Sequence, residues 1–200
     1  MLPSMRTKLS SLLFLTLLPA CMSVSEPSEG AGRVRADVAT TVPPYTSVHA
    51  TYKERLESPY AFVELTGNYA LVGRHLQELA SALEQQGLRA DGPPFALFYD
   101  DPAMTPIAEL RSRLCLPIEA GASVRAPLLQ DMLPAATVAY ARVSGPYPEV
   151  PRAYPGLLEY VSRMGWKANG PVREIYLVPP GSVRDWSQLL TEVQVVVSGS

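Results

Sequence analysis

The stretch Gly170-Pro171-Val172-Arg173-Glu174-Ile175-Tyr176-Leu177 predicts a turn followed by a β-strand. Gly and Pro are typical of turns, and successive side chains of a strand point to opposite faces of its sheet. Glu174 and Tyr176 therefore share one face, whereas Ile175 and Leu177 share the other. A carboxylate beside an aromatic ring, on a strand that is otherwise apolar, indicates a face with a chemical role.

This stretch belongs to an internal repeat. When the sequence is shifted by 78 residues, positions 63–93 align with 141–171 without a gap, and nine of these 31 positions are identical. Chance at average composition predicts about two identities. The identical pairs are Gly67/Gly145, Tyr69/Tyr147, Val72/Val150, Arg74/Arg152, Leu79/Leu157, Gly87/Gly165, Ala90/Ala168, Gly92/Gly170 and Pro93/Pro171.

Each repeat predicts the order strand, helix, strand, strand. In the first, runs of apolar residues between turn residues predict strands at 60–65, 95–99 and 113–118. Spacings of four, three and four indicate one apolar stripe of a helix, formed by Val72, Leu76, Leu79 and Leu83. Gly87 suits the end of this helix, where a positive φ is common.

The second repeat follows the same order. Its strands are predicted at 137–143, from the turn at 169–171 onward, and at 192–197. The helical spacing recurs at Val150, Tyr154, Leu157 and Val161. Because Pro is favourable only in the first turn of a helix, the second helix is predicted to begin at Pro155, after an irregular segment, and to end at Gly165.

The predicted fold class is α+β, built from two pseudo-symmetric β-α-β-β repeats. The repeats span about 57–119 and 133–198, within a domain predicted at 57–200. Each repeat is too small to enclose a core alone, so the two are expected to share a sheet with both helices packed on one side. Strand alternation places aliphatic side chains under the helices, namely Ala61, Val63, Leu65, Leu97, Leu114, Leu116, Ala139, Ala141, Val143, Ile175, Leu177, Val193, Val195 and Val197.

The opposite face mixes aromatic rings with carboxylates and arginines. It is predicted to carry Phe62, Glu64, Ala96, Phe98, Arg113, Cys115, Tyr140, Arg142, Glu174, Tyr176, Glu192 and Gln194. One interpretation is a solvated sheet face. The other is a small-molecule pocket that favours cations, because rings beside a carboxylate attract positive charge. Ala96 aligns with Glu174, so the polar chemistry lies in the second repeat.

The N-terminus is predicted to be a lipoprotein signal peptide over residues 1–20. Arg6 and Lys8 precede a short apolar run, and Leu18-Pro19-Ala20-Cys21 matches a site at which Cys21 is lipidated. The alternative is an ordinary secretory signal with Cys21 incidental. Residues 21–56 are then a flexible tether. Met22 after the cysteine implies an outer-membrane lipoprotein facing the periplasm, if the source is Gram-negative.

Several classes of function are disfavoured. A net charge of −2 with no Lys/Arg cluster argues against nucleic-acid binding. Outside Cys21 the one cysteine, Cys115, lies in an apolar run typical of a buried side chain. His49 lies in the predicted tether, and His75 is expected at a helix surface. No metal site and no cofactor are predicted, and the membrane is expected to be contacted only through the lipid.

From about Leu56 to Val197 the chain resembles the GyrI-like small-molecule-binding domain, the effector-binding domain of AraC- and MerR-type regulators, related in fold to SOUL haem-binding proteins. The motifs that carry the resemblance are Val143-Ser144-Gly145-Pro146-Tyr147, Tyr154 with Leu157-Leu158-Glu159-Tyr160, the stretch at 170–177, and Thr191-Glu192-Val193-Gln194-Val195. The resemblance implies a ligand cleft between the repeats, with Glu174 as its central charge and aromatic walls that include Tyr147 and Trp166. The DNA-binding part of the regulators has no counterpart here.

The first functional hypothesis is a binding domain, tethered in the envelope, for a hydrophobic small molecule that is either neutral or cationic. The expected ligand-binding residues are Glu174, Tyr176, Tyr140, Arg142, Tyr147, Trp166, Phe62, Phe98 and Glu192. The alternative is a hydrolase of strained or electrophilic molecules, in which Glu174 activates water and Tyr176 or Tyr147 donates a hydrogen bond. Haem binding lacks an axial ligand on this face, and a protein-adaptor role remains a further alternative.

Overall fold

The computed structural model describes residues 39–178 and 183–199. The chain divides into two compact units, Met1–Val34 and Arg35–Ser200, and all described residues belong to the second. The predicted signal peptide and the lipidation site at Cys21 lie outside the described residues. No helix in the described part of the chain is both long enough and apolar enough to cross a membrane.

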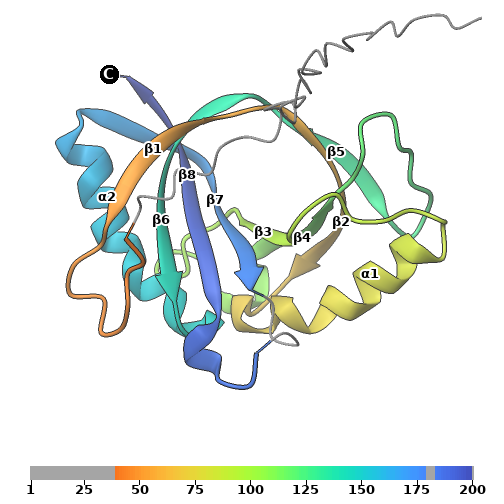
Figure 1. Ribbon diagram of the computed structural model, residues 1–200, viewed down its shortest axis with the longest axis horizontal. Coiled ribbons are helices and arrows are strands. Elements are labelled where there is room, and N and C mark those ends of the chain that lie inside the picture. The colour runs from red at the N-terminus through yellow and green to blue at the C-terminus, as the bar shows by residue number, and fades with distance from the viewer. Residues whose placement is uncertain (1–38, 179–182, 200) are drawn as a thin grey trace, which may run out of the picture. The chain divides into compact units, whose positions relative to one another are not determined.

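Eight strands of the described chain form one antiparallel sheet in the order β1-β6-β8-β7-β3-β4-β2-β5 (Figure 1). The strands are β1 (Ala50–Arg55), β2 (Ser58–Thr66), β3 (Phe95–Phe98), β4 (Arg111–Pro117), β5 (Leu129–Leu133), β6 (Ala136–Ser144), β7 (Trp166–Val178) and β8 (Leu190–Gly199). The helices are α1 (Leu76–Glu84) and α2 (Tyr154–Arg163), preceded by the 3₁₀ segments η1 (Tyr69–His75) and η3 (Tyr147–Ala153). Short 3₁₀ turns are η2 (Ile107–Glu109) and η5 (Trp186–Gln188).

The structure confirms the predicted repeat and extends it. The units β2-α1-β3-β4 and β6-α2-β7-β8 follow the predicted order, and Gly87 and Gly165 end their helices with φ of 74° and 70°. Two strands were not predicted. Residues of β1 were assigned to the tether, and β5 was not assigned, yet the 78-residue shift places Arg55 of β1 on Leu133 of β5. Each repeat therefore begins with an additional strand.

The predicted tether boundary at residue 56 is also wrong for the residues before β1. Thr41 forms a bridge with Val143, and Tyr45 is 8% exposed within the apolar cluster under α2. The Tyr45 hydroxyl donates a hydrogen bond of 2.6 Å to the carbonyl of Ser144. Within the described residues, contacts with the sheet and the core therefore begin at Thr41, before β1.

The two additional strands are exchanged between the repeats. β1 pairs with β6 of the second repeat, and β5 pairs with β2 of the first. Two residues link β1 to β2, although these strands are first and seventh in the sheet. In a flat sheet they would be about 29 Å apart at about 4.8 Å a strand, whereas three Cα steps span about 11 Å. The sheet must therefore curl, and Arg55 Nη2 bonds the Pro134 carbonyl at 2.7 Å, between the two links.

The curled sheet buries side chains on both faces. On the face that carries the helices, one apolar cluster packs under α1 and another under α2. A third cluster covers the opposite face; its buried members are Tyr60, Phe62, Phe95, Leu97, Cys115, Leu133 and Ile175. Helices on one side of the sheet confirm the predicted architecture.

The predicted faces are wrong for β3 and β7. Ala96 lies opposite Leu114, and Glu174 lies opposite Val193, so both occupy the helix-bearing face. Phe98 and Tyr176 share that face, whereas Leu97, Ile175 and Leu177 lie on the other. The alternation could not decide the face because all four residues of β3 are buried.

A buried polar cluster lies on the face opposite the helices. Glu192 is 2% exposed and accepts hydrogen bonds of 2.6 Å from both Lys53 Nζ and Gln194 Nε2. Arg142 Nε lies 3.5 Å from the other Glu192 oxygen. Arg173 packs over the ring of Phe95 at 4.0 Å. Glu192 is thus surrounded by cationic side chains and is neutralised within the fold.

Gly156 provides a test of how α2 packs on the segment before β1. A Cβ at Gly156 would lie 2.5 Å from Val48 Cγ2 and 2.7 Å from Val48 Cβ. Gly→Ala in a helix ordinarily stabilises by about 1 kcal/mol, but overpacking costs about 1–3 kcal/mol. Gly156→Ala is therefore expected to lower the free energy of unfolding, measured by urea titration.

Val48→Gly supplies the control background, because it removes both the Cγ2 methyl group and the Cβ that the added methyl group would meet. With the whole valine side chain removed, Gly156→Ala is expected to be neutral or stabilising. Equal destabilisation in both backgrounds would contradict this packing.

Candidate ligand-binding site

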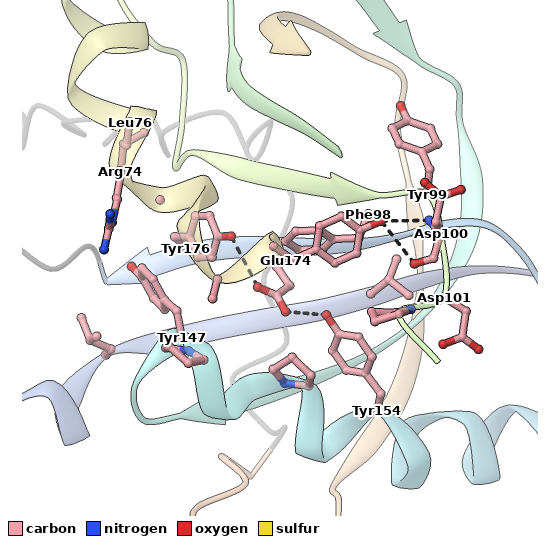
Figure 2. A pocket seen from close by; sticks show the side chains of 18 of the residues that line it. Arg74, Leu76, Phe98, Tyr99, Asp100, Asp101, Tyr147, Tyr154, Glu174 and Tyr176 are labelled. Atoms are coloured by element: carbon pink, nitrogen blue, oxygen red, sulfur yellow. Dashed lines mark hydrogen bonds between the residues drawn. The ribbon is translucent and has the colours of Figure 1, made fainter. Parts of the chain in front are cut away.

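A cavity of about 850 Å³ opens on the helix-bearing face of the sheet. Its walls come from both repeats: η1, α1 and β3 from the first, and η3, α2 and β7 from the second. Figure 2 shows the side chains of the two halves gathered around Glu174. The cavity therefore lies between the repeats, where the resemblance placed a cleft, although on the face that strand alternation assigned to the core.

The cavity is centred on the local twofold axis that relates the repeats. β3 and β7 are equivalent strands, and they pair antiparallel with Ala96 directly opposite Glu174. These two residues are equivalent positions under the 78-residue shift, so the axis passes between them. Directly opposite residues of antiparallel strands share one face. The centre of the sheet thus places the Glu174 carboxyl group in the cavity lining, with the methyl group of Ala96 directly beside it on the neighbouring strand.

Two aromatic pairs form equivalent walls on either side of the axis. The rings of Tyr69 and Phe98 have centroids 4.6 Å apart, and those of Tyr147 and Tyr176 are 4.5 Å apart. Under the 78-residue shift the first pair corresponds to the second. Both tyrosines stand at the first position of their 3₁₀ segments, η1 and η3. The repeat therefore builds the same aromatic support twice.

Three polar residues at the centre distinguish the second repeat from the first. Tyr154 Oη donates a hydrogen bond of 2.5 Å to Glu174 Oε1, and Tyr176 Oη donates one of 3.4 Å to Oε2 (Figure 2). The equivalent positions of the first repeat hold Leu76, Ala96 and Phe98. Because both tyrosines are hydrogen-bonded to Glu174, the three positions that are apolar in the first repeat form one polar cluster in the second.

Glu174 is a buried carboxyl group without a cationic partner. It is 3% exposed and forms no ion pair with any residue that the structure describes. Burial raises its pKa to about 7, although the hydrogen bonds from Tyr154 and Tyr176 act in the opposite direction. Burial and the Glu174 charge together raise the pKa of Tyr147 to about 12. The tyrosines accordingly remain hydrogen-bond donors near neutral pH, while Glu174 gains or loses a proton there.

The rim of the cavity carries charged residues, some of which are neutralised by an ion pair and some of which are not. Asp100 is held by Arg111 through contacts of 2.8 Å and 3.1 Å, and these hydrogen bonds lower the pKa of the aspartate. Asp101 Oδ1 accepts the backbone N–H of Ala103 at 2.8 Å. Arg74 is exposed and makes no hydrogen bond or ion pair within the described chain. The rim therefore combines a neutralised pair with two accessible charges.

Four of the residues predicted to bind ligand line the cavity together: Glu174, Tyr176, Tyr147 and Phe98. The structure places the other five elsewhere. Phe62, Tyr140, Arg142 and Glu192 face the opposite side of the sheet. Trp166 packs at the far end of β7, with its ring 5.2 Å from Tyr52 and 6.4 Å from Tyr160.

Sequence reasoning missed Tyr154, Tyr69 and Arg74 as cavity residues. Tyr154 was counted in the apolar stripe of the second helix, where its ring packs but its hydroxyl reaches Glu174. Its alignment with Leu76 was a usable signal, because it shows the same apolar-to-polar change as Ala96 and Glu174. Within the described residues no cluster of three or more His, Cys, Asp or Glu side chains could hold a metal ion.

The sequence profile of the GyrI-like small molecule binding domain matches residues 50–198. The chain belongs to this family. The GyrI-like assignment accounts for the eight-stranded antiparallel sheet, the two helices packed against it and a role in binding a small molecule. No protein with a curated description matches the chain.

Solved structures share the GyrI-like fold at low sequence identity. The EcmrR C-terminal domain is 20% identical with a TM-score of 0.66, over 76% of this chain and 99% of that one. The EcmrR chain in the EcmrR–DNA complex is 18% identical with a TM-score of 0.68, and the match covers 76% of this chain but only 57% of the EcmrR chain.

The names of two further similar structures state an activity or a bound ligand. A hydrolase from Listeria innocua is 11% identical with a TM-score of 0.57, over 76% of this chain and 93% of that one. SAV2435 bound to tetraphenylphosphonium is 12% identical with a TM-score of 0.50, over 75% of this chain and 94% of that one. At these identities the likeness establishes the fold alone.

Proposed function

We propose that this GyrI-like domain binds a hydrophobic, positively charged small molecule in the cavity above Glu174. One observation carries the proposal: a carboxyl group that is 3% exposed, surrounded by aromatic rings and left without a cation by the fold. Removing an ionised carboxylate from water costs several kcal/mol unless an opposite charge compensates. A ligand cation would supply that charge.

The walls suit the apolar part of such a ligand. The rings of Tyr147, Tyr176 and Tyr154 lie around the carboxyl group, and ring faces attract cations by about 0.5–2 kcal/mol. Small-molecule sites commonly have volumes of about 300–1,000 Å³, and this cavity holds about 850 Å³. The tetraphenylphosphonium named for SAV2435 is a ligand of this chemical class.

Tetraphenylphosphonium provides the test, because it has no titratable group. Glu174 must be ionised to pair with it, so affinity should rise as pH increases through about 7 and level off above. Below that pH, Glu174 is protonated in the free domain and the cation must displace a proton. Binding measured by calorimetry is expected to be about tenfold weaker at pH 6 than at pH 8.

Glu174→Gln should abolish this pH dependence and weaken binding about tenfold or more at pH 8. Glu64→Gln is the control, since Glu64 is an exposed carboxylate outside the cavity lining. An unchanged affinity in Glu174→Gln would exclude the proposed role of the carboxylate.

Hydrolysis of an electrophilic small molecule is a second candidate. It is favoured by the pKa of Glu174 near 7, the range in which a general base is most effective. Glu174 Oε2 has only the 3.4 Å contact with Tyr176, which leaves this oxygen better able to accept a water proton. With an epoxide substrate, turnover should vanish in Glu174→Gln while ligand binding persists. Turnover retained in that variant would exclude Glu174 as the base.

We also propose that the domain is tethered in the cell envelope through a lipid on Cys21. The support is the sequence Leu18-Pro19-Ala20-Cys21 after a short apolar run. Cys21→Ser is expected to move the protein from the membrane fraction to the soluble fraction and to prevent labelling with a fatty-acid analogue. Membrane association that survives this substitution would contradict a lipid anchor.

A further inference from the structure

We infer that the cavity takes a zwitterionic amphiphile, with a cationic group at Glu174, an anionic group at Arg74 and an apolar tail at the rim. The inference rests on the proposed function and narrows its ligand class. It begins from Arg74, which lines the same cavity as Glu174. Arg74 carries a positive charge that a purely cationic ligand cannot use.

The repeat shows that Arg74 lacks, within the described chain, the carboxylate partner that its equivalent has. Arg152 in the second repeat forms an ion pair with Glu149, three residues earlier, at 2.5 Å. The position equivalent to Glu149 holds Leu71 in the first repeat. Arg74 consequently forms no ion pair or hydrogen bond in the described chain, and it lines the cavity, whereas Arg152 does not. The guanidinium at the cavity is thus left available to a ligand.

The arrangement of charges assigns a side to each ligand group. In Figure 2 Arg74 lies on one side of Glu174, and Asp100 and Asp101 lie on the other, with Tyr147 and Tyr176 on the Arg74 side. Asp100 is neutralised by Arg111, whereas the Asp101 carboxylate would repel an anion. A simple monocation is attracted by Glu174 but repelled by Arg74. A ligand that also carries an anion gains from both.

Depth in the cavity sets the order of the ligand groups. Glu174 is 3% exposed, whereas Arg74 is exposed, so the cation lies deepest and the anion nearer the mouth. Exposed Leu158 and Trp186 complete the apolar part of the rim, whereas Tyr99 lies on the Asp100 side of Glu174, away from Arg74 (Figure 2). The order ammonium, anion, tail is that of a phosphocholine-type headgroup on a single chain. Arginine binds phosphate in a two-pronged manner, and aromatic rings bind quaternary ammonium groups.

Two ligands with the same tail separate the zwitterion from the cation. Decylphosphocholine and decyltrimethylammonium would be titrated by calorimetry at pH 8, below the concentrations at which they form micelles. Arg74→Gln is expected to weaken decylphosphocholine about five- to tenfold and to leave decyltrimethylammonium unchanged or slightly tighter. Arg152→Gln, the equivalent arginine outside the cavity, should change neither. Equal effects of Arg74→Gln on both ligands, or none on either, would overturn the inference.

Glu174→Gln distinguishes this inference from the proposed function. If it weakens both ligands while Arg74→Gln shows no selectivity, cation binding stands and the zwitterion inference fails. If Glu174→Gln weakens binding of neither ligand, both the proposed function and the zwitterion inference fail. Phosphocholine without a tail is expected to bind far more weakly than decylphosphocholine. Comparable affinities of the two would contradict the inference that the ligand has an apolar tail. Because the Arg74 side chain is exposed and has no partner among the described residues, Arg74→Gln should fold normally, which circular dichroism would check.

Discussion

The antiparallel pairing of β3 with β7 is the constraint on which the rest of the structure depends. It sets Ala96 opposite Glu174 and so brings the centres of the two repeats together on the local twofold axis. Because β3 and β7 are equivalent strands, each repeat contributes one aromatic wall, Tyr69 on Phe98 and Tyr147 on Tyr176. The helices cover the flanking apolar clusters and leave the central strip to the cavity. A shift in this register would separate the walls from the carboxyl group.

The exchanged strands β1 and β5 explain how a sheet this wide closes over its second face. Their two-residue links draw the ends of the sheet together, so the face away from the helices closes on aromatic and aliphatic side chains. Glu192 on that face is neutralised by Lys53 and Arg142. Glu174 has no such partners. Among the described residues, two carboxyl groups on the sheet are buried and differ in character: Glu192 is paired with cations of the fold, and Glu174 is not.

The eight elements of the repeat could be predicted because their apolar spacing recurs at a constant shift. The strand β1 could not be predicted, because Ala50–Arg55 mixes polar and apolar residues and forms a strand by pairing with β6, which is distant in sequence. The cavity residues divide in the same way. Glu174 differs in charge from its equivalent Ala96 and so can be recognised, whereas Tyr154 fits a helical stripe that predicts a core side chain. The predicted face of a strand is wrong where both sides of that strand are buried. The start of β7 also differs from the prediction, because a bulge between Asn169 and Arg173 lets the strand continue through residues that predict a turn.

The twofold arrangement of the repeats also bears on why they are joined in one chain. A protein with a single repeat could form this sheet only as a homodimer, with its first strands swapped between partners. Any residue at the position of Glu174 would then face its own copy across the axis, about 5 Å away. Two buried carboxylates so close would repel each other strongly. Two repeats joined in one chain are free of that symmetry requirement, so one repeat can carry a carboxylate while the other carries a methyl group.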